Sequence, residues 1–332
     1  MKILLTGSSG MIGSNILNFL LKTTNDSFVC VESFTRKGEP FNLDKAVSDW
    51  SRVKVITHDL AVPFTEKTKK EIGEIDMILN IASDSHVDRS ITHPVDFIQN
   101  NVNLAINMLE LAREKKPKLF LQFSTDEVYG AAKENELHAE WSPIIPSNPY
   151  SASKACQEAI AISYWRTYGV PVIITNTMNV FCENQDWEKY IPLCVKKILL
   201  NEEIAIHSYP GATKAGSRFY IHTQSVAEAV RFLISKPVSL YPDSDKPDRY
   251  NIVGDREVNN LELAKLIACI LKKPLKYKLV DFHSQRPGHD TRYALDGTTL
   301  KNFGWNPTQN FDFKIEETVL KLKERFDTEY SK

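Results

Sequence analysis

The chain has 332 residues, of which 42% are hydrophobic and 25% charged, and its formal net charge is −1. This composition is typical of a soluble globular protein, long enough for one large α/β unit or two packed lobes. The near-neutral charge predicts no broad electropositive surface, which argues against a nucleic acid partner.

The uncharged stretch at residues 3–21 raises the question of a membrane segment. Glycine, serine and asparagine interrupt it, and it has neither a basic leader nor a cleavage site, so we expect no membrane span and no signal peptide. The five cysteines form no Cys-x-x-Cys motif and no cluster with metal-ligand spacing. We therefore expect reduced thiols, no bound metal and a cytoplasmic location.

Short apolar runs alternate with helical patterns in the first half of the chain. Expected strands cover residues 2–6, 28–32, 53–57, 75–82, 118–124 and 172–175, and expected helices cover 11–22, 94–114 and 149–168. Continuous apolar strands separated by helices indicate a parallel sheet covered on both faces. The sequence therefore predicts an α/β, doubly wound (Rossmann) fold, with residues 1–176 as a dinucleotide-binding domain.

The pattern becomes looser in the second half, where prolines interrupt it repeatedly. Helices are still expected near residues 188–200, 223–235, 259–272 and 313–326. We expect residues 177–332 to form a smaller α/β substrate lobe, with segments near 219–236 and 249–253 returning to the first domain.

A glycine-rich turn follows the first expected strand. Gly7, Gly10 and Gly13 have the spacing Gly-x-x-Gly-x-x-Gly. A tight turn, close approach of the backbone to a pyrophosphate and a closely packed helix start each favour a residue without Cβ. The free N–H groups of the helix that follows can bind phosphate oxygens. This turn therefore predicts a dinucleotide site.

The second expected strand ends at Glu32, about 20 residues after the glycine turn. A carboxylate there can accept hydrogen bonds from the adenosine ribose and repels a 2′-phosphate, which favours NAD over NADP. Arg36 and Lys37 weaken this preference, and an ordinary surface glutamate is the alternative. Asp59 and Leu60 close the third strand, where they can flank the adenine.

The spacing Tyr-x-x-x-Lys occurs twice, at Tyr129/Lys133 and at Tyr150/Lys154. Gly130 follows Tyr129 directly, so a helix that joins the first pair is doubtful. The second pair lies in NPYSASKA, residues 148–155, where the asparagine can cap a helix and the proline suits its first position. We therefore interpret the first pair as a coincidence of spacing.

Residues four positions apart on a helix share a face, so Lys154 is expected close to Tyr150. A cation there lowers the pKa of a phenol from its usual value of about 10, which makes the tyrosinate available as a base. The alternative is a surface aromatic beside a solvated lysine.

Two adjacent carboxyl groups, Asp126 and Glu127, follow the fifth expected strand. Ser124 and Glu127 have the spacing of a capping box, so the segment can be a structural cap. Alternatively, repulsion between the two carboxylates keeps one protonated and the other ionised, as an acid and a base require. Their place at the end of a strand suits a site, since doubly wound folds bind ligands there.

Six motifs occur in order along nearly the whole chain: TGSSGMIGSN (6–15), SHVDRSI (85–91), STDEVYG (124–130), NPYSASKA (148–155), YNIVG (250–254) and RPGHDTRYALD (286–296). With these motifs the sequence resembles the extended short-chain dehydrogenase/reductase family, and within it the nucleotide-sugar 4,6-dehydratases. The resemblance implies an NAD-dependent lyase that converts a dTDP- or UDP-hexose to its 4-keto-6-deoxy form.

The resemblance also implies roles for five residues. Tyr150, supported by Lys154, takes the proton of the sugar 4-hydroxyl while hydride passes from C4 to NAD⁺. Glu127 takes the C5 proton, protonated Asp126 delivers a proton to the departing 6-hydroxyl, and hydride then returns to C6. Thr125 hydrogen-bonds the C4 oxygen.

The binding residues that the resemblance implies form two groups. The cofactor residues, besides Tyr150 and Lys154, are Gly7, Gly10, Met11, Ile12, Gly13, Glu32, Asp59, Leu60, Ala82 and Asn101. The residues that bind the nucleotide-diphosphate hexose are Ser85, Asn179, Lys189, Arg218, Asn251, Arg286, His289 and Tyr293.

The family is usually homodimeric through a four-helix bundle, which residues 94–114 and 149–168 would supply here. Their apolar positions fit such a bundle and fit an ordinary core equally well: Val102, Leu104, Ile106, Leu109, Ala161, Ile162 and Trp165.

Three motifs in the second half depart from the family pattern. They are residues 179–183, where Asn-x-Tyr-Gly-Pro is usual, residues 218–220 in place of Arg-Asp-Trp, and residues 206–208 in place of Val-Tyr-Gly. These departures leave the nucleotide and the hexose open. A 5,6-dehydratase, an epimerase, a decarboxylase and a catalytically silent NAD-binding protein remain alternatives, and Asp126 is the residue that favours dehydration.

Overall fold

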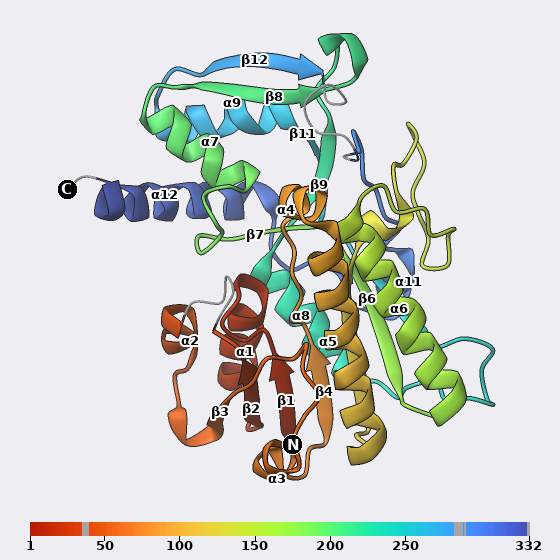
Figure 1. The fold of residues 1–332 in the computed structure, drawn as a ribbon. Helices are drawn as coiled ribbons and strands as arrows, with labels where there is room; N and C mark the ends of the chain where they lie inside the picture. The colour runs from red at the N-terminus through yellow and green to blue at the C-terminus, as the bar shows by residue number, and fades with distance from the viewer. Residues whose placement is uncertain (35–39, 282–287, 289, 331–332) are drawn as a thin grey trace.

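The computed structural model describes residues 1–34, 40–281, 288 and 290–330. Its main body is a seven-stranded sheet with helices on both faces (Figure 1), and every pairing in this sheet is parallel. In the order of the sheet, the strands are β10 (Asp248–Ile252), β6 (Val172–Thr177), β5 (Leu119–Thr125), β4 (Met77–Asn80), β1 (Lys2–Thr6), β2 (Ser27–Glu32) and β3 (Val53–Thr57). The predicted doubly wound fold is confirmed.

Two hydrophobic cores cover the two faces of this sheet. One face packs against α1 (Met11–Thr23), α2 (Pro40–Ala46), α8 (Thr223–Ile234) and α11 (Thr298–Asn302). The other face packs against α3 (Glu66–Ile72), α5 (Pro94–Lys115) and α6 (Pro149–Tyr168), and α4 (Val87–Thr92) precedes α5. The strands read as unbroken apolar runs because both of their faces are buried.

The strand order reverses between β1 and β4, because the chain leaves β1 for β2 on one side and returns to β4 on the other. In a doubly wound sheet the loops after the strands separate at this point and leave a crevice at the carboxyl ends of the strands. The expected strands and helices of the first half are present, with ends that differ by about two residues at most.

A smaller lobe lies over these carboxyl ends (Figure 1). It has a three-stranded sheet of β11 (Glu257–Asn259), β9 (Ser217–His222) and β7 (Asn179–Phe181), and a two-stranded sheet of β12 (Lys276–Asp281) and β8 (Glu203–Ser208). With α7 (Tyr190–Leu199), α9 (Asn260–Leu271) and α12 (Phe311–Tyr330), these strands share a separate hydrophobic core. The lobe therefore covers the crevice.

Three segments from the second half of the chain lie in the main body. Strand β10 pairs with β6 and completes the large sheet, α8 packs against α1, and α11 packs against β10. Strand β9, which directly precedes α8, pairs instead with β7 and β11 in the small sheet. The chain thus passes between the two parts of the molecule at His222.

Helix α6 begins at Pro149, where the sequence predicts it. Asn148 is the N-cap: its side chain accepts a hydrogen bond from the backbone N–H of Ser151, whose hydroxyl completes a capping box. The helix ends at Gly169, which adopts the left-handed conformation with φ of 67°. These local signals set the first and last residues of the helix, and therefore the direction in which each of its side chains points.

A buried ion pair connects α6 to β10. The side chains of Glu158 and Arg249 are 0% and 1% exposed, and their carboxylate and guanidinium groups are in direct contact. Asn176 donates to the same carboxylate at 2.7 Å, and Arg249 also donates to the carbonyl oxygen of Glu140 at 2.9 Å. Removing one member of such a pair leaves the other charge buried without compensation.

We expect the substitution Arg249→Met to lower the free energy of unfolding by about 3–5 kcal/mol, measured by urea denaturation. The double substitution Arg249→Met, Glu158→Leu should recover much of this loss, because it removes both charges. The matched control is Lys278→Met, which breaks the pair with Glu203 between side chains 59% and 51% exposed and should change little. Equal effects of Arg249→Met and the control would contradict this interpretation.

Candidate active site

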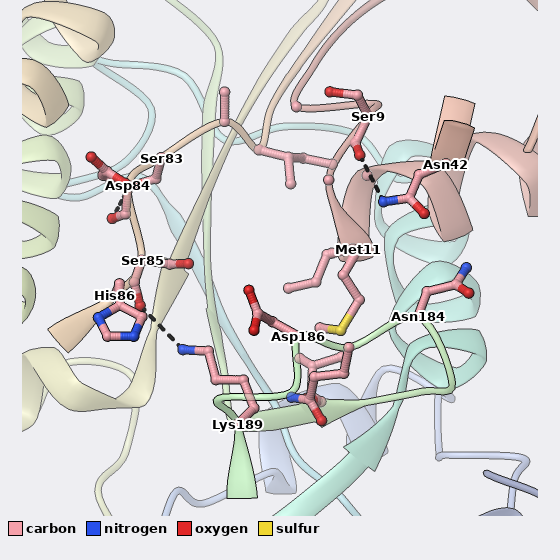
Figure 2. A pocket seen from close by; sticks show the side chains of 18 of the residues that line it. Ser9, Met11, Asn42, Ser83, Asp84, Ser85, His86, Asn184, Asp186 and Lys189 are labelled. Carbon is pink, nitrogen blue, oxygen red and sulfur yellow. Dashed lines mark hydrogen bonds between the residues drawn. The ribbon is translucent and has the colours of Figure 1, made fainter. Parts of the chain in front are cut away.

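A large cleft of about 1250 Å³ lies between the carboxyl ends of the strands and the smaller lobe. In Figure 2, Ser83, Asp84, Ser85 and His86, which follow β4, line one wall, while Met11 and Asn184 lie on the other side. Asp186 and Lys189 approach from the smaller lobe. Residues from both parts of the molecule therefore face the same space.

The glycine turn lies at one end of this cleft, between β1 and α1. Gly7 has a φ of +72°, and a Cβ added to Gly13 would lie 2.0 Å from the carbonyl oxygen of Gly7. The turn can close only because these positions lack side chains. The first turn of α1 leaves its N–H groups free toward the cleft, and Gly10, Met11 and Ile12 line it. These features fit the pyrophosphate of a dinucleotide.

Glu32 lines the cleft next to this turn and also holds the turn in place. Its carboxylate accepts hydrogen bonds from the hydroxyls of Ser8 at 2.7 Å and Ser9 at 2.6 Å, and burial raises its pKa. The sequence predicts a partner for ribose or an ordinary surface glutamate at this position. Glu32 is buried, and its role in ordering the turn was not predicted. The sequence did contain a signal for this role: two hydroxyl residues lie between glycines, and a glutamate ends the next strand.

The other predicted cofactor residues do not all reach the cleft. Asp59, Leu60 and Ala82 line it. Asn101 does not, because its buried side chain binds the backbone of Asp84 and donates to Ser153 at 2.9 Å. Asn101 therefore lies off the cleft wall, which Asn100 lines, and its contact with the cofactor stays a prediction.

Thr125, Asp126 and Glu127 extend from the end of β5 into the cleft. Asp126 begins the 3-10 helix η2 (Asp126–Tyr129). The N-cap of this helix is Thr125, whose hydroxyl accepts a hydrogen bond from the N–H of Glu127 at 3.3 Å. The cap is therefore Thr125 and not Ser124, which the capping-box spacing suggested. The cap and the pair of carboxyl groups coexist in one segment.

Asp126 has the surroundings of a neutral carboxyl group. Burial first, and then the negative charge of Glu127, raise its pKa to about 7. Its Oδ1 accepts from the Thr125 hydroxyl at 2.9 Å, while its buried Oδ2 accepts from no group among the described residues. An unpartnered buried oxygen suits a protonated carboxyl better than a carboxylate.

Glu127 has more donors around it. Its Oε2 accepts from the side-chain amide of Asn148 at 3.4 Å and from the hydroxyl of Tyr293 at 3.3 Å. Removal from water raises its pKa, and the Asn148 hydrogen bond, followed by the charges of Arg218 and Lys189, opposes this rise. The two adjacent carboxyl groups therefore differ: Asp126 has few donors and Glu127 has several.

Tyr150 and Lys154 line the cleft from one face of α6. The ammonium of Lys154 donates to the carbonyl oxygen of Phe123 at 2.7 Å and to Gln157 at 2.6 Å. Burial lowers the pKa of Lys154 to about 7, although the charge of Glu158 opposes this shift.

The predicted fall in the pKa of Tyr150 is contradicted. Burial raises the pKa of its phenol, the negative charges of Glu127 and Asp126 raise it further, and only a hydrogen bond with Thr125 opposes this. The ammonium of Lys154 donates to the Phe123 carbonyl oxygen and to Gln157, and not to the Tyr150 phenol.

The other Tyr-x-x-x-Lys pair has a structural position. The phenol of Tyr129 is buried and donates to the carbonyl oxygen of Glu140 at 2.9 Å and to Asn176 at 3.2 Å. Lys133 is exposed beyond Gly130, which has a φ of 77° and ends η2. Neither residue lines the cleft.

The predicted substrate residues divide into two groups. Ser85, Asn179 and Lys189 line the cleft, and the Lys189 ammonium donates across it to the carbonyl oxygen of Ser85 at 3.4 Å (Figure 2). Asn251 is fully buried and its amide donates to the carbonyl oxygens of His138 and Asp296, so it lies off the cleft wall and its substrate contact stays a prediction. Arg286 and His289 lie outside the described residues.

Arg218 and Tyr293 lie behind the two carboxyl groups and not on the cleft wall. The guanidinium of Arg218 donates to the carbonyl oxygens of Ser217 and Thr291, both at 2.7 Å, and to that of Asp290. It also lies 4.4 Å from the centre of the Tyr293 ring. Tyr293 thus contacts Glu127 and Arg218, a contact that the predicted nucleotide-binding role did not include.

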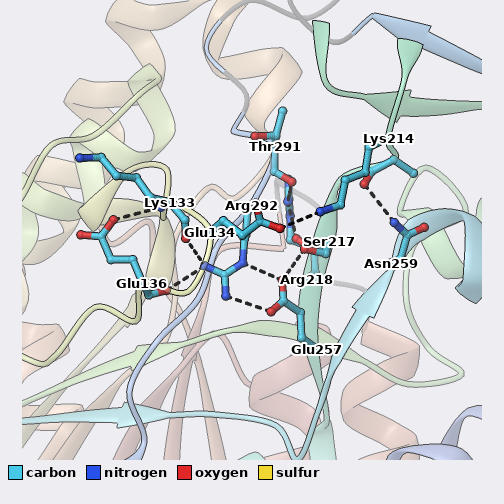
Figure 3. Close-up of polar contacts among 11 residues, drawn as sticks. Lys133, Glu134, Glu136, Lys214, Ser217, Arg218, Glu257, Asn259, Thr291 and Arg292 are labelled. Atoms are coloured by element: carbon cyan, nitrogen blue, oxygen red, sulfur yellow. Dashed lines mark hydrogen bonds and ion pairs between the residues drawn. The ribbon is translucent and has the colours of Figure 1, made fainter.

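Figure 3 shows the hydrogen bonds and ion pairs that hold Arg218, Thr291 and Arg292 in place. Arg292 forms a two-point ion pair with Glu257 of β11 at 2.8 and 2.9 Å, and it donates to the carbonyl oxygens of Lys133 and Glu136. Residues 290–293 therefore join the segment after η2 to the smaller lobe and hold Arg218 and Tyr293 in position.

The described part of the chain contains no group of three or more His, Cys, Asp or Glu residues that could hold a metal ion. Across the same ranges, no helix is long and apolar enough to cross a membrane.

Comparisons with known proteins agree with this geometry. The family described as GDP-mannose 4,6 dehydratase matches residues 4–318. A probable dTDP-glucose 4,6-dehydratase of Sinorhizobium fredii is 33% identical, over 96% of this chain and 92% of that protein. The dTDP-glucose 4,6-dehydratase of Haemophilus influenzae is 32% identical, over 96% and 97%. The crystal structure of DesIV, a dTDP-glucose 4,6-dehydratase from Streptomyces venezuelae with NAD bound, superposes with a TM-score of 0.87 at 29% identity, covering 100% of this chain and 99% of that one.

The high pKa of Asp126 predicts a cost to stability. The folded chain keeps the Asp126 proton up to about pH 7, whereas the unfolded chain releases it near pH 4, so this group makes the fold less stable as pH rises between these values. We expect Asp126→Asn to be more stable than the wild type at pH 8, by on the order of 1 to 4 kcal/mol, and similar to it below pH 4.

Urea denaturation at the two pH values measures this difference. The control is Asp312→Asn, which changes an exposed carboxyl group and should not make the protein more stable than the wild type at pH 8. A stability difference between Asp126→Asn and the wild type that does not grow with pH would contradict a neutral Asp126.

Proposed function

The chain belongs to the GDP-mannose 4,6 dehydratase family, and on that premise we propose that it is an NAD-dependent dTDP-hexose 4,6-dehydratase. The observation that carries this proposal is the unequal pair Asp126 and Glu127, which lies in the same cleft as Tyr150, Lys154 and the glycine turn. An epimerase needs no such acid–base pair at this place.

The cofactor residues of this proposal are those of the cleft wall: Gly7, Gly10, Met11, Ile12, Gly13, Glu32, Asp59, Leu60 and Ala82. When bound, NAD would supply the acceptance of hydride from C4 and its return to C6, where C5 takes up a proton, so that the 4-ketone is kept in the product. The buried carboxylate of Glu32 supports NAD over NADP, because a 2′-phosphate beside it would meet a negative charge.

Oxidation at C4 needs a base for the 4-hydroxyl proton. Tyr150 supplies the phenolate oxygen, Thr125 hydrogen-bonds the C4 oxygen, and Lys154 supplies positive charge on the same helix face. Because burial raises the pKa of Tyr150, the phenol acts in this role only when that charge is close to it.

The elimination follows from the two carboxyl groups. The ketone acidifies the neighbouring C5–H bond, and Glu127 takes that proton. The C6–O bond then breaks, and Asp126, which keeps its proton up to about pH 7, transfers it to the departing hydroxyl, so that water leaves. The electron pair of the C5–H bond becomes the C5–C6 double bond.

The substrate in this proposal is a nucleoside diphosphate hexose. Ser85, Asn179 and Lys189 border the cleft, and Lys189 offers a positive charge to a diphosphate. The names of the relatives support dTDP-glucose, whereas the three motif departures in the second half keep UDP-glucose as the competing substrate.

We expect the protein, incubated with dTDP-glucose, UDP-glucose or UDP-N-acetylglucosamine, to release one water from the dTDP sugar and to incorporate solvent deuterium at C5. Mass spectrometry and proton NMR measure both. Glu127→Gln and Asp126→Asn should each slow the reaction by about 10²–10⁴-fold. Retention of the full mass by all three sugar nucleotides would refute the dehydratase proposal, and water loss from a UDP sugar alone would refute the dTDP assignment.

We also propose that the protein forms a homodimer through α5 and α6. Val95 is 63% exposed, and Val102 and Ile106 are half-buried along the same stripe of α5. The other expected interface residues divide differently: Leu104, Leu109, Ala161 and Trp165 are buried within one chain, and Ile162 packs against that core. A dimer would therefore rest on Val95, Val102 and Ile106.

We expect the wild type to elute as a dimer in size-exclusion chromatography with light scattering, and Ile106→Glu to elute as a monomer, because the charge would be buried in the interface. The control is Leu320→Glu, at an exposed leucine of α12, which should remain dimeric. A monomeric wild type at micromolar concentration would exclude this assembly.

Two further points belong to the proposal. We propose a cytoplasmic location, which the five free cysteines support because reduced thiols suit a reducing compartment. We propose residues 1–176, together with 219–236 and 249–253, as the NAD-binding domain and the remainder of 177–332 as the sugar-nucleotide domain. The pairing of β10 with β6 and the packing of α8 on α1 support this division.

A further inference from the structure

Asn148 makes two kinds of contact at the start of α6. Its Oδ1 accepts from the backbone N–H of Ser151 at 2.9 Å and so caps the helix. Its Nδ2 therefore points the other way, where it donates to Oε2 of Glu127 at 3.4 Å and to the carbonyl oxygen of Gly288 at 3.0 Å. Because the cap occupies the oxygen, only the nitrogen side of the amide can face the carboxylate.

We propose that Asn148 is a positioning residue for the reaction: it caps the helix that carries Tyr150 and Lys154 and, with the same amide, orients Glu127 toward the substrate. This inference rests on the proposed dehydratase function. It assigns a role in the elimination to a residue whose sequence pattern indicates only a helix cap.

The position of the donors on Glu127 supports this role. Asn148 and Tyr293 both donate to Oε2. No hydrogen bond to Oε1 comes from any side chain or backbone group in the described ranges. One oxygen is therefore held by the protein, and the other remains available to take a proton.

The charge around Glu127 makes the amide donor important. The titratable and charged groups that face it from the surrounding elements are Asp126, Tyr150, Tyr293, Lys189, Arg218 and Asp290. Lys189 and Arg218 favour the ionised carboxylate, while Asp290 and the removal from water disfavour it. A neutral donor at hydrogen-bond distance stabilises the ionised carboxylate of Glu127 without adding a charge.

Two substitutions separate the cap from the contact with Glu127. Serine and aspartate cap helices about as well as asparagine, so Asn148→Ser and Asn148→Asp should keep α6 intact. Asn148→Ser removes the donor, and Asn148→Asp replaces it with a second carboxylate beside Glu127. Both changes disfavour the ionised form of Glu127. We therefore expect the acid limb of the pH profile of kcat to move to higher pH, by about one unit in Asn148→Ser and further in Asn148→Asp.

A single-turnover experiment gives a second readout. Oxidation at C4 does not use Glu127, whereas elimination does, so slower elimination should let reduced cofactor accumulate in both variants, seen by its absorbance. Exchange of solvent deuterium into C5 should slow by about tenfold in Asn148→Ser. Thermal unfolding tests that both variants remain folded.

The matched control is Asn259, which caps α9 in the same way and donates its amide to the carbonyl oxygen of Ala215 at 3.0 Å, away from Glu127. Asn259→Ser and Asn259→Asp should leave the acid limb and the cofactor absorbance unchanged. A wild-type pH profile and wild-type exchange at C5 in both Asn148 variants would overturn the inference. A wild-type protein that dehydrates no sugar nucleotide would instead overturn the proposed function.

Discussion

The removal from water of two adjacent carboxyl groups at the end of β5, the buried Asp126 and the half-buried Glu127, is the constraint on which the site depends. Each carboxylate removed from water needs donors or cations nearby, or it takes up a proton. Within the described residues, Asp126 accepts a side-chain hydrogen bond from the Thr125 hydroxyl at Oδ1 and none at Oδ2, and it keeps its proton to about pH 7, while Glu127 accepts from Asn148 and Tyr293. The difference between an acid and a base thus arises from an unequal supply of donors to two neighbouring residues.

The supply of donors depends on how the two parts of the molecule are joined. Asn148 belongs to the large sheet's helix layer, whereas Tyr293 and Arg218 are held by residues 290–293 and the small sheet. The Arg292–Glu257 pair fixes that segment to β11, and Ser147 donates to the Asp290 carboxylate at 2.9 Å. The surroundings of Glu127 are therefore assembled from chain segments far apart in sequence, and a shift of either part would change its pKa.

Periodicity and local signals were enough for the fold and for the start of α6, because alternating buried strands and an Asn-Pro cap act over a few residues. Side-chain direction depends on packing between distant segments. Adjacent helical residues point about 100° apart, so Asn100 faces the cleft while Asn101 is turned into the core. Asn251 matched a motif, yet its side chain points toward His138 and Asp296. The short strands of the smaller lobe, such as β7 and β11, lack enough residues for a periodic pattern.

The same burial that makes Asp126 an acid works against Tyr150 as a base, since a phenolate is also a charge removed from water. Lys154 can offset this only while it is charged, and burial lowers its pKa to about 7. The charge of Glu158, which is held by Arg249 and Asn176 in the core, counters this shift. The buried ion pair between α6 and β10 therefore does more than join a helix to the sheet. By stabilising the ionised form of Glu158 it favours the ammonium form of Lys154, and it couples the stability of the fold to the charge that the oxidation step requires.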